Sequence, residues 1–254
     1  MRRRRSAPSG DGPFLRRITL IPDGVDLKRH PFDVPALAGL DLELRTNVTF
    51  LVGENGSGKS TLLEAIATCC GFSPEGGSRD HHFRTRDDPG ELAAALRLSW
   101  RPKVTDGFFM RAESFFNFAT YLDGTASSLQ RYGGVSLHAQ SHGESFLALF
   151  ANRFDRGIYL LDEPEAALSP QRQLSFLKVV HDLESDGRAQ FLIASHSPIL
   201  LAYPGATLLG LDDGPIREVR WEETAHYVIT RDFLASPARF FAHLFAKDDP
   251  ESEQ

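Results

Sequence analysis

A glycine-rich segment at residues 53–60, GENGSGKS, constrains the fold of this 254-residue chain more than any other feature. It matches the phosphate-binding pattern G-x-x-x-x-G-K-[ST] at every fixed position. The apolar run before it, 48–52, is typical of a buried strand, and the run after it, 61–67, is typical of the start of a helix. A strand, a glycine-rich turn and a helix in this order predict an α/β fold that binds a nucleotide.

The chemistry of this segment suits phosphate. Glycines allow the backbone to curl so that successive N–H groups point inward, and the helix N-terminus adds positive partial charge at the same place. We expect Lys59 to reach the β- and γ-phosphates of ATP and the Ser60 hydroxyl to bind Mg²⁺. The residues expected to bind the nucleotide are Gly53, Glu54, Asn55, Gly56, Ser57, Gly58, Lys59, Ser60 and Thr61.

Length and charge bound the remaining possibilities. The formal net charge of −6 argues against a wholly basic nucleic-acid-binding domain, and no apolar run approaches the ~18 residues of a membrane span, so no membrane insertion is expected. The basic N-terminus, residues 1–13, and the acidic C-terminus, 247–254, are predicted to be disordered tails. Two adjacent cysteines give no disulfide scaffold, which fits a cytoplasmic protein.

The hydrophobic pattern predicts one domain over residues 14–246. Alternating runs at 15–21 and 40–44 indicate an N-terminal antiparallel β element. Later segments alternate between helix and buried strand, which indicates a mostly parallel sheet flanked by helices. We expect helices at 144–153, 170–183 and 222–245, and strands at 158–161 and 189–194.

The middle of the chain is less regular, and we expect a helical subdomain inserted there, at about 72–142. Residues 71–90 resemble a loop, and 92–100 favour a strand over a helix. The aromatic-rich stretch 108–121 is more typical of core than of a base-stacking platform. A basic group in the loop, comprising Arg79, Arg84 and Arg86, is either a solvated surface or a contact for a phosphate backbone.

Two acidic residues close the apolar strand 158–161. A buried strand would place Asp162 at its carboxyl end, where ligands bind in open α/β sheets and where this residue can support Mg²⁺. The next residue, Glu163, would point elsewhere and could orient or deprotonate an attacking water. A paired Asp-Glu favours ATP hydrolysis over phosphoryl transfer to a second substrate.

Taken in order along the chain, these motifs resemble those of the ABC-type ATPases, from about Leu15 to Leu211. The shared elements are the phosphate loop, a signature-like segment at 140–145 (QSHGES), the acidic strand, the turn 165–170 and a switch histidine, His196. The resemblance implies an ABC-type P-loop NTPase fold and two chains that sandwich ATP head to tail. It also implies that Ser141, Gly143 and Glu144 meet the partner's ATP, and that His196 senses the γ-phosphate within its own chain.

Several positions depart from the family pattern. His142 stands where the signature usually has glycine, and Ser169 stands where an aspartate is frequent. The glutamine expected before the signature is absent, and Arg111 or Glu113 is a candidate for its place. Phe32 is a candidate for the aromatic residue that stacks on adenine.

The Asp-Glu-Pro-Glu form of the acidic motif is most similar to that of compact, stand-alone ATPases labelled as AAA type, which are grouped near the chromosome and DNA-repair ATPases. Lys59 and Asp162 are 103 positions apart, which leaves no room for long coiled-coil arms. The leading hypothesis is an ATP-hydrolysing homodimer that moves an unknown protein partner, with nucleic acid as a possible ligand. The alternatives are the ATPase subunit of an ABC transporter and a nucleotide-dependent switch with negligible turnover.

Overall fold

The computed structural model describes residues 13–73, 90–111, 156–212 and 214–246. A six-stranded sheet organises this part of the chain, in the order β5-β6-β7-β3-β8-β9. The first five strands of that order are parallel, and β9 runs antiparallel to β8. The strands are β3 (Val48–Val52), β5 (Gly107–Arg111), β6 (Gly157–Asp162), β7 (Ala189–Ala194), β8 (Thr207–Gly210) and β9 (Arg217–Glu218).

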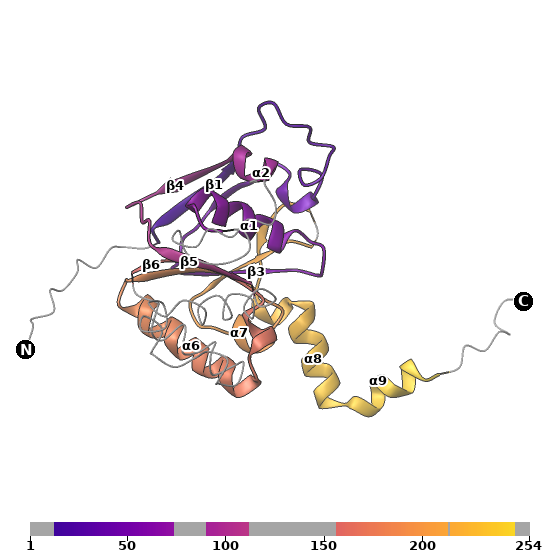
Figure 1. The fold of residues 1–254 in the computed structure, drawn as a ribbon. Helices are drawn as coiled ribbons and strands as arrows, with labels where there is room; N and C mark the ends of the chain where they lie inside the picture. Colours follow the sequence, from indigo (N-terminus) through magenta and orange to yellow (C-terminus); the bar gives the residue numbers. More distant parts are fainter. Residues whose placement is uncertain (1–12, 74–89, 112–155, 213, 247–254) are drawn as a thin grey trace, which may run out of the picture.

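The central strands β6, β7 and β3 are buried throughout because both faces of the sheet are covered. On β5, Phe108 and Met110 pack into one core, whereas Phe109 between them packs into the other. Helices α6 (Pro170–Ser185) and α7 (Pro198–Leu201) cover the first face, and α1 (Lys59–Cys70) covers the second. Figure 1 shows α1 between the two sheets, with α6 and α7 on the far side of the large sheet.

A second, antiparallel sheet lies over α1. It has the order β2-β1-β4, with β1 at Leu15–Leu20, β2 at Asp41–Glu43 and β4 at Leu96–Trp100. Buried Gln190 on β7 ties the two sheets together: Leu15 N donates to its Oε1 at 2.7 Å, and its Nε2 donates to Leu15 O at 2.9 Å. These bonds satisfy a polar side chain that would otherwise be costly to bury.

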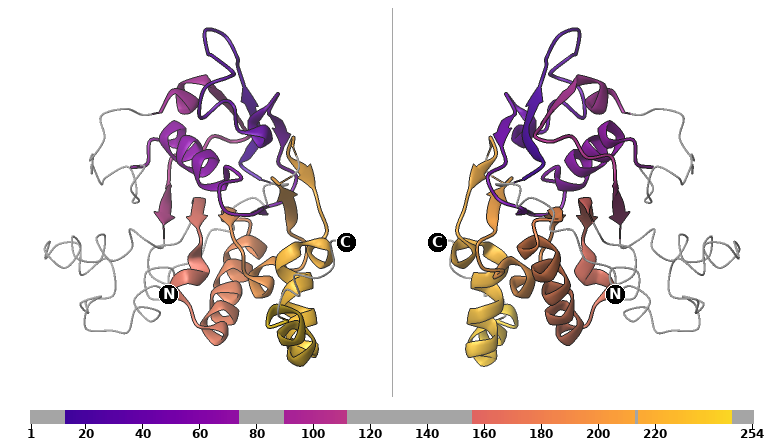
Figure 2. Two further views of the ribbon diagram at one scale, coloured as in Figure 1. Left: turned by 90° about the vertical axis from the view of Figure 1, so that its right-hand side faces the viewer. Right: turned by 90° about the vertical axis from the view of Figure 1, so that its left-hand side faces the viewer.

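The C-terminal helices leave the body of the protein. Helices α8 (Ala225–Ala235) and α9 (Pro237–Leu244) follow one another at the edge that carries β8 and β9, and they extend away from it (Figures 1 and 2). Neither helix contains a buried residue, and large apolar side chains such as Leu234 and Leu244 are 70% and 69% exposed. No helix among the described residues is long and apolar enough to cross a membrane.

These elements confirm the predicted fold class, including the antiparallel element and the helical C-terminal segment. Two expectations are refined. Residues 92–100, favoured as a strand, instead fall in a short helix α2 (Glu91–Ala95) followed by β4. Within the predicted insert at 72–142, residues 91–111 belong to the two sheets and the helix that packs on them, so a helical insert would lie in 112–142, outside the described residues.

Candidate functional site

The phosphate loop joins β3 to α1 at the carboxyl edge of the parallel sheet. Gly58 has φ +99°, and a Cβ there would lie 2.8 Å from Val34 Cγ1, so the position requires glycine for conformation and for space. The Lys59 ammonium donates to Gly53 O at 2.7 Å and to Glu54 O at 2.9 Å. The Lys59 side chain therefore lies folded over its own loop, within reach of a phosphate placed there.

Charge around Lys59 is balanced by carboxylates. Burial lowers the pKa of the Lys59 ammonium, and Glu163, Asp212 and Asp162 oppose that shift. Asp212 follows β8 and accepts a 2.5 Å hydrogen bond from Glu54 N, which fixes the start of the loop. Sequence reasoning did not identify Asp212, because its only signal is an acid that follows an apolar strand.

Asp162 ends β6 beside the first turn of α1. The Ser60 hydroxyl donates to Asp162 Oδ1 at 3.1 Å, as expected for two groups that serve one ion. Burial raises the pKa of Asp162 to about 6, against the opposing effects of the Ser60 hydrogen bond and Arg111. The carboxylate is thus costly to ionise here until a cation or donor compensates it.

Arg111 supplies one such positive charge. It ends β5, directly opposite Asp162 in the parallel register, with its Nε 3.5 Å from Asp162 Oδ2. Its Nη1 also lies 2.6 Å from Glu64 Oε1 on α1. Of the two candidates for the place of the missing glutamine, Arg111 is therefore at the site, whereas Glu113 lies outside the described residues.

The pair Ser60 and Asp162 fits a magnesium ion in part. Hydroxyl and carboxylate oxygens are the ligands that Mg²⁺ prefers, and this ion usually takes its remaining ligands from water and phosphates. Among the described residues, no group of three or more His, Cys, Asp or Glu side chains could hold a metal. The chemistry of these two residues therefore suits an ion that arrives with its nucleotide.

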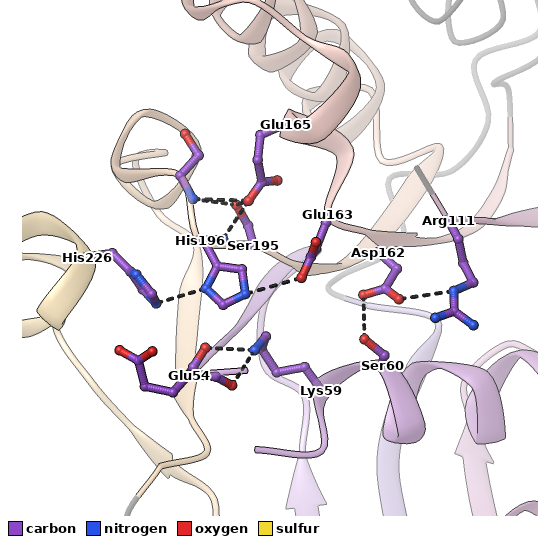
Figure 3. Close-up of polar contacts among 12 residues, drawn as sticks. Glu54, Lys59, Ser60, Arg111, Asp162, Glu163, Glu165, Ser195, His196 and His226 are labelled. Atoms are coloured by element: carbon purple, nitrogen blue, oxygen red, sulfur yellow. Dashed lines mark hydrogen bonds and ion pairs between the residues drawn. The ribbon is translucent and has the colours of Figure 1, made fainter. Parts of the chain in front are cut away.

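Glu163 has an unusual backbone. Its φ of 50° and ψ of 51° are left-handed, and among the described residues it is the one non-glycine residue with positive φ. Such a conformation costs on the order of 1–3 kcal/mol and concentrates at functional sites. It turns the Glu163 carboxylate away from Asp162 and toward His196, so that Glu163 Oε1 lies 3.2 Å from His196 Nε2 (Figure 3).

The loop that carries His196 is held by Glu165. A single oxygen, Glu165 Oε1, accepts hydrogen bonds from Ser195 Oγ at 2.9 Å, His196 N at 2.6 Å and Ser197 N at 3.1 Å. Figure 3 shows this carboxylate above the histidine, on the segment that follows β6. In the sequence, Glu165 indicated only which subfamily of ATPases the chain resembles. Its hydrogen bonds to the loop after β7 depend on the pairing of β6 with β7, which no local pattern reveals.

A second histidine, His226, completes this side of the site and was missed in the sequence. It lies in the first turn of α8, and its Nε2 is 3.0 Å from His196 Nδ1. It also lines a cavity of about 450 Å³ together with Glu54 and Asp212. A single histidine in a helical segment carries no motif that could have identified it.

Other predicted residues do not enter the described site. Phe32, expected to stack on adenine, is 4% exposed and packs in the core around α1, so that expectation is wrong. Ser169 precedes α6 as its N-cap residue without a side-chain capping bond. The signature residues Ser141, Gly143 and Glu144, the neighbouring His142 and the basic group at 79–86 lie outside the described residues.

Comparison with known proteins agrees with the fold. A family model described as "AAA domain" matches residues 32–98, and one described as "AAA domain, putative AbiEii toxin, Type IV TA system" matches residues 131–202. The hemin import ATP-binding protein HmuV of Pseudomonas aeruginosa is 33% identical over 201 residues, which cover 70% of this chain and 78% of that protein. The zinc import ATP-binding protein ZnuC of Paracoccus denitrificans is 25% identical over 185 residues, 68% of each chain.

Among solved structures, a putative metal-chelate type ABC transporter in an inward-facing conformation matches with a TM-score of 0.50 and 15% identity, over 85% of this chain and 88% of that chain. The fold and the motifs on it are those of a P-loop nucleotide hydrolase. The chain belongs to the ABC-type ATPases, and it is an ATP-binding protein that hydrolyses ATP.

Proposed function

We propose that this ATPase holds Mg²⁺-ATP against residues 53–61 and that Glu163 prepares the attacking water. The observation that carries the proposal is that three separated sequence segments bring their side chains to one edge of the parallel sheet (Figure 3). These side chains are Lys59, the consecutive pair Asp162 and Glu163, and His196. In open α/β sheets this edge is where ligands bind.

Each side chain has a distinct task in this proposal. Lys59 would exchange its two carbonyl partners for the β- and γ-phosphates, an exchange that replaces neutral acceptors with charged ones. Ser60 and Asp162 would hold Mg²⁺, which neutralises charge that develops on the phosphates. The Glu163 side chain is 42% exposed, so water can reach the carboxylate that is to orient it.

We further propose that two copies of the chain close around ATP. The support is the resemblance of residues 140–145 to a signature segment that completes the site of a second copy, and Ser141, Gly143 and Glu144 are its proposed contacts. A hydroxyl and a glycine at a helix N-terminus suit an anionic phosphate. Closure driven by ATP would then move a partner protein that the site itself does not identify.

An import system is the second candidate for that partner. The relatives named above are import ATP-binding proteins, and this supports a role as the ATPase subunit of an ABC transporter. Arg111 is the feature that argues for a different partner, because the resemblance to transporter ATPases predicts a glutamine at its place. Stimulation of hydrolysis by double-stranded DNA, falling with salt, would instead favour a role on nucleic acid.

The decisive experiment compares Glu163→Gln with the wild type and with Glu43→Gln, a control on an exposed strand residue far from the site. We expect Glu163→Gln to bind ATP, to lose about 100-fold or more of its phosphate release, and to accumulate as a dimer with ATP in light scattering. Unchanged turnover in this variant would overturn the assignment of Glu163. ATP binding without dimer accumulation would overturn the proposed pairing of two chains.

A further inference from the structure

Helix α8 begins against the nucleotide site rather than in solvent. Thr224, which is 7% exposed, caps the helix: its Oγ1 accepts from Tyr227 N at 3.4 Å and donates to Trp221 O at 2.7 Å. Trp221 in turn packs edge-to-face on Tyr227, with ring centroids 4.3 Å apart. These contacts fix the first turn of α8, and with it the position of His226.

His226 and His196 meet as a defined pair. Their rings are nearly perpendicular, at 86°, with centroids 4.6 Å apart and with His226 Nε2 3.0 Å from His196 Nδ1. The other nitrogen of His196, Nε2, is buried, lies 3.2 Å from Glu163 Oε1 and has no well-aligned hydrogen bond. The imidazole of His196 therefore lies between a carboxylate and a second imidazole (Figure 3).

Only one protonation pattern satisfies both contacts of a neutral His196. Burial lowers the pKa of His196, and Lys59 and His226 add to that effect, so the neutral ring predominates at neutral pH. A neutral imidazole carries one N–H. If that hydrogen were on Nδ1, the Nε2 lone pair would face the Glu163 carboxylate at 3.2 Å, which is repulsive. With the hydrogen on Nε2, His226 must donate to Nδ1.

We propose that His226 is a positioning residue that holds His196 in its Nε2–H tautomer. The buried Nε2–H then lies beside the Glu163 carboxylate, 3.2 Å from its Oε1 without a well-aligned bond, and would be available to donate to the γ-phosphate. This inference rests on the proposed function, in which His196 acts on the γ-phosphate. It adds that the first turn of α8 acts on His196 through His226. The position of the C-terminal helices and the tautomer of His196 are therefore linked.

Two substitutions separate the hydrogen bond from the shape of the ring. His226→Phe keeps a planar ring and removes the donor, whereas His226→Gln keeps an N–H donor on a flexible chain. The cavity beside His226 gives both side chains room. His181→Phe is the matched control, because His181 is an exposed histidine on α6 near Tyr203 and away from the site.

The first readout is the ¹⁵N spectrum of the histidine rings in the full-length, nucleotide-free protein, with His196→Gln used to assign the signals. We expect the wild type, His226→Gln and His181→Phe to show His196 protonated at Nε2, and His226→Phe to show both tautomers. An unchanged His196 tautomer in His226→Phe would overturn the proposal, whatever the enzyme's activity.

The second readout is steady-state ATP hydrolysis. We expect His226→Phe to lower kcat by about tenfold or more with little change in KM, and His226→Gln to recover most of that loss. If His196→Gln is impaired while His226→Phe is fully active, the role of His226 is overturned and that of His196 stands. If His196→Gln itself hydrolyses ATP at the wild-type rate, the proposed function of His196 fails, and the spectra alone then decide the tautomer.

Discussion

The phosphate loop and the loop that carries His196 (residues 195–197, here called the switch loop) lie on the same edge of the sheet, yet they are positioned in different ways. Lys59 bonds to carbonyls five and six residues away in its own loop. His196 is held by Glu165, 31 residues before it, and by His226, 30 residues after it. The phosphate-loop half of the site is therefore held mostly by residues close in sequence. The His196 half is assembled by the fold from residues about 30 positions away.

This difference determines what each half can do. The phosphate loop is shaped mainly by its own strand and helix, with one bond from Glu54 N to the distant Asp212 at its start, so it is suited to hold the constant part of the ligand. The switch loop depends on two other segments, those of Glu165 and His226, so a movement of either of them reaches His196. Such dependence would suit the role proposed for His196, which is to report the state of ATP to the rest of the molecule.

The largest expected effect on ATP hydrolysis comes from a substitution in the phosphate loop. Lys59→Ala removes the ammonium that is placed to meet the terminal phosphates, and we expect hydrolysis to fall by about 100-fold or more. Phosphate release at saturating ATP measures this, with Lys178→Ala on the exposed face of α6 as the control. Activity within about threefold of the wild type would contradict the central role given to the phosphate loop.

The second effect is a pH dependence of stability at Asp162, which accepts a hydrogen bond from Ser60 beside the phosphate loop. Burial raises the pKa of Asp162 from its ordinary 3.8 to about 6, so the folded state favours the protonated acid. This contribution is fully present below pH 3.8 and is lost as the pH rises through about 6. The size of the shift corresponds to about 3 kcal/mol.

Asp162→Asn removes this titration, so the variant should gain stability relative to the wild type as the pH rises from 4 to 7.5. Urea unfolding of the nucleotide-free proteins at both pH values measures the difference. Other titrating groups cancel in the comparison, because both proteins share them. A difference that stays constant with pH would show that the Asp162 carboxylate is compensated already in the absence of ligand.

The same contrast explains how far the sequence could be read. The phosphate loop, Asp162 and the parallel strands were predictable, because each follows from a local pattern of glycines, acids and apolar runs. Glu165, Asp212 and His226 were not, because each acts on a segment about 30 or more residues away and carries no pattern of its own. Phe32 was a candidate for stacking on adenine because an aromatic residue was expected upstream, whereas its burial in the core depends on packing.

Removing a contact that holds the switch loop should lower hydrolysis less than Lys59→Ala does. Glu165→Ala removes three hydrogen bonds from the switch loop while it leaves the phosphate loop intact. We expect kcat to fall by about tenfold, with ATP affinity nearly unchanged, since misplacement of a catalytic group costs rate more than binding. Glu43→Ala on the exposed side of β2 is the control. Hydrogen exchange at the amides of His196 and Ser197 should accelerate in Glu165→Ala, and a rate equal to the wild type would refute the anchoring role.

The smallest expected effect is a second pH dependence of stability, which comes from His196. Its sign is opposite to that of the dependence caused by Asp162. The pKa of His196 is lowered from 6.5, first by burial and then by Lys59 and His226, so the unfolded state takes up this proton at a higher pH than the folded state. The contribution is fully present above pH 6.5 and is lost as the pH falls through the folded pKa.

His196→Gln should therefore gain stability relative to the wild type as the pH falls from 7.5 to 5. Lys59 is among the causes of the shift, so the same comparison made in a Lys59→Ala background should show a weaker pH dependence. That weakening would demonstrate that the two halves interact through charge, although they are positioned independently. If the stability difference has the same pH dependence in both backgrounds, Lys59 does not affect the protonation of His196. His196 could then respond to ATP only through direct contact with the γ-phosphate.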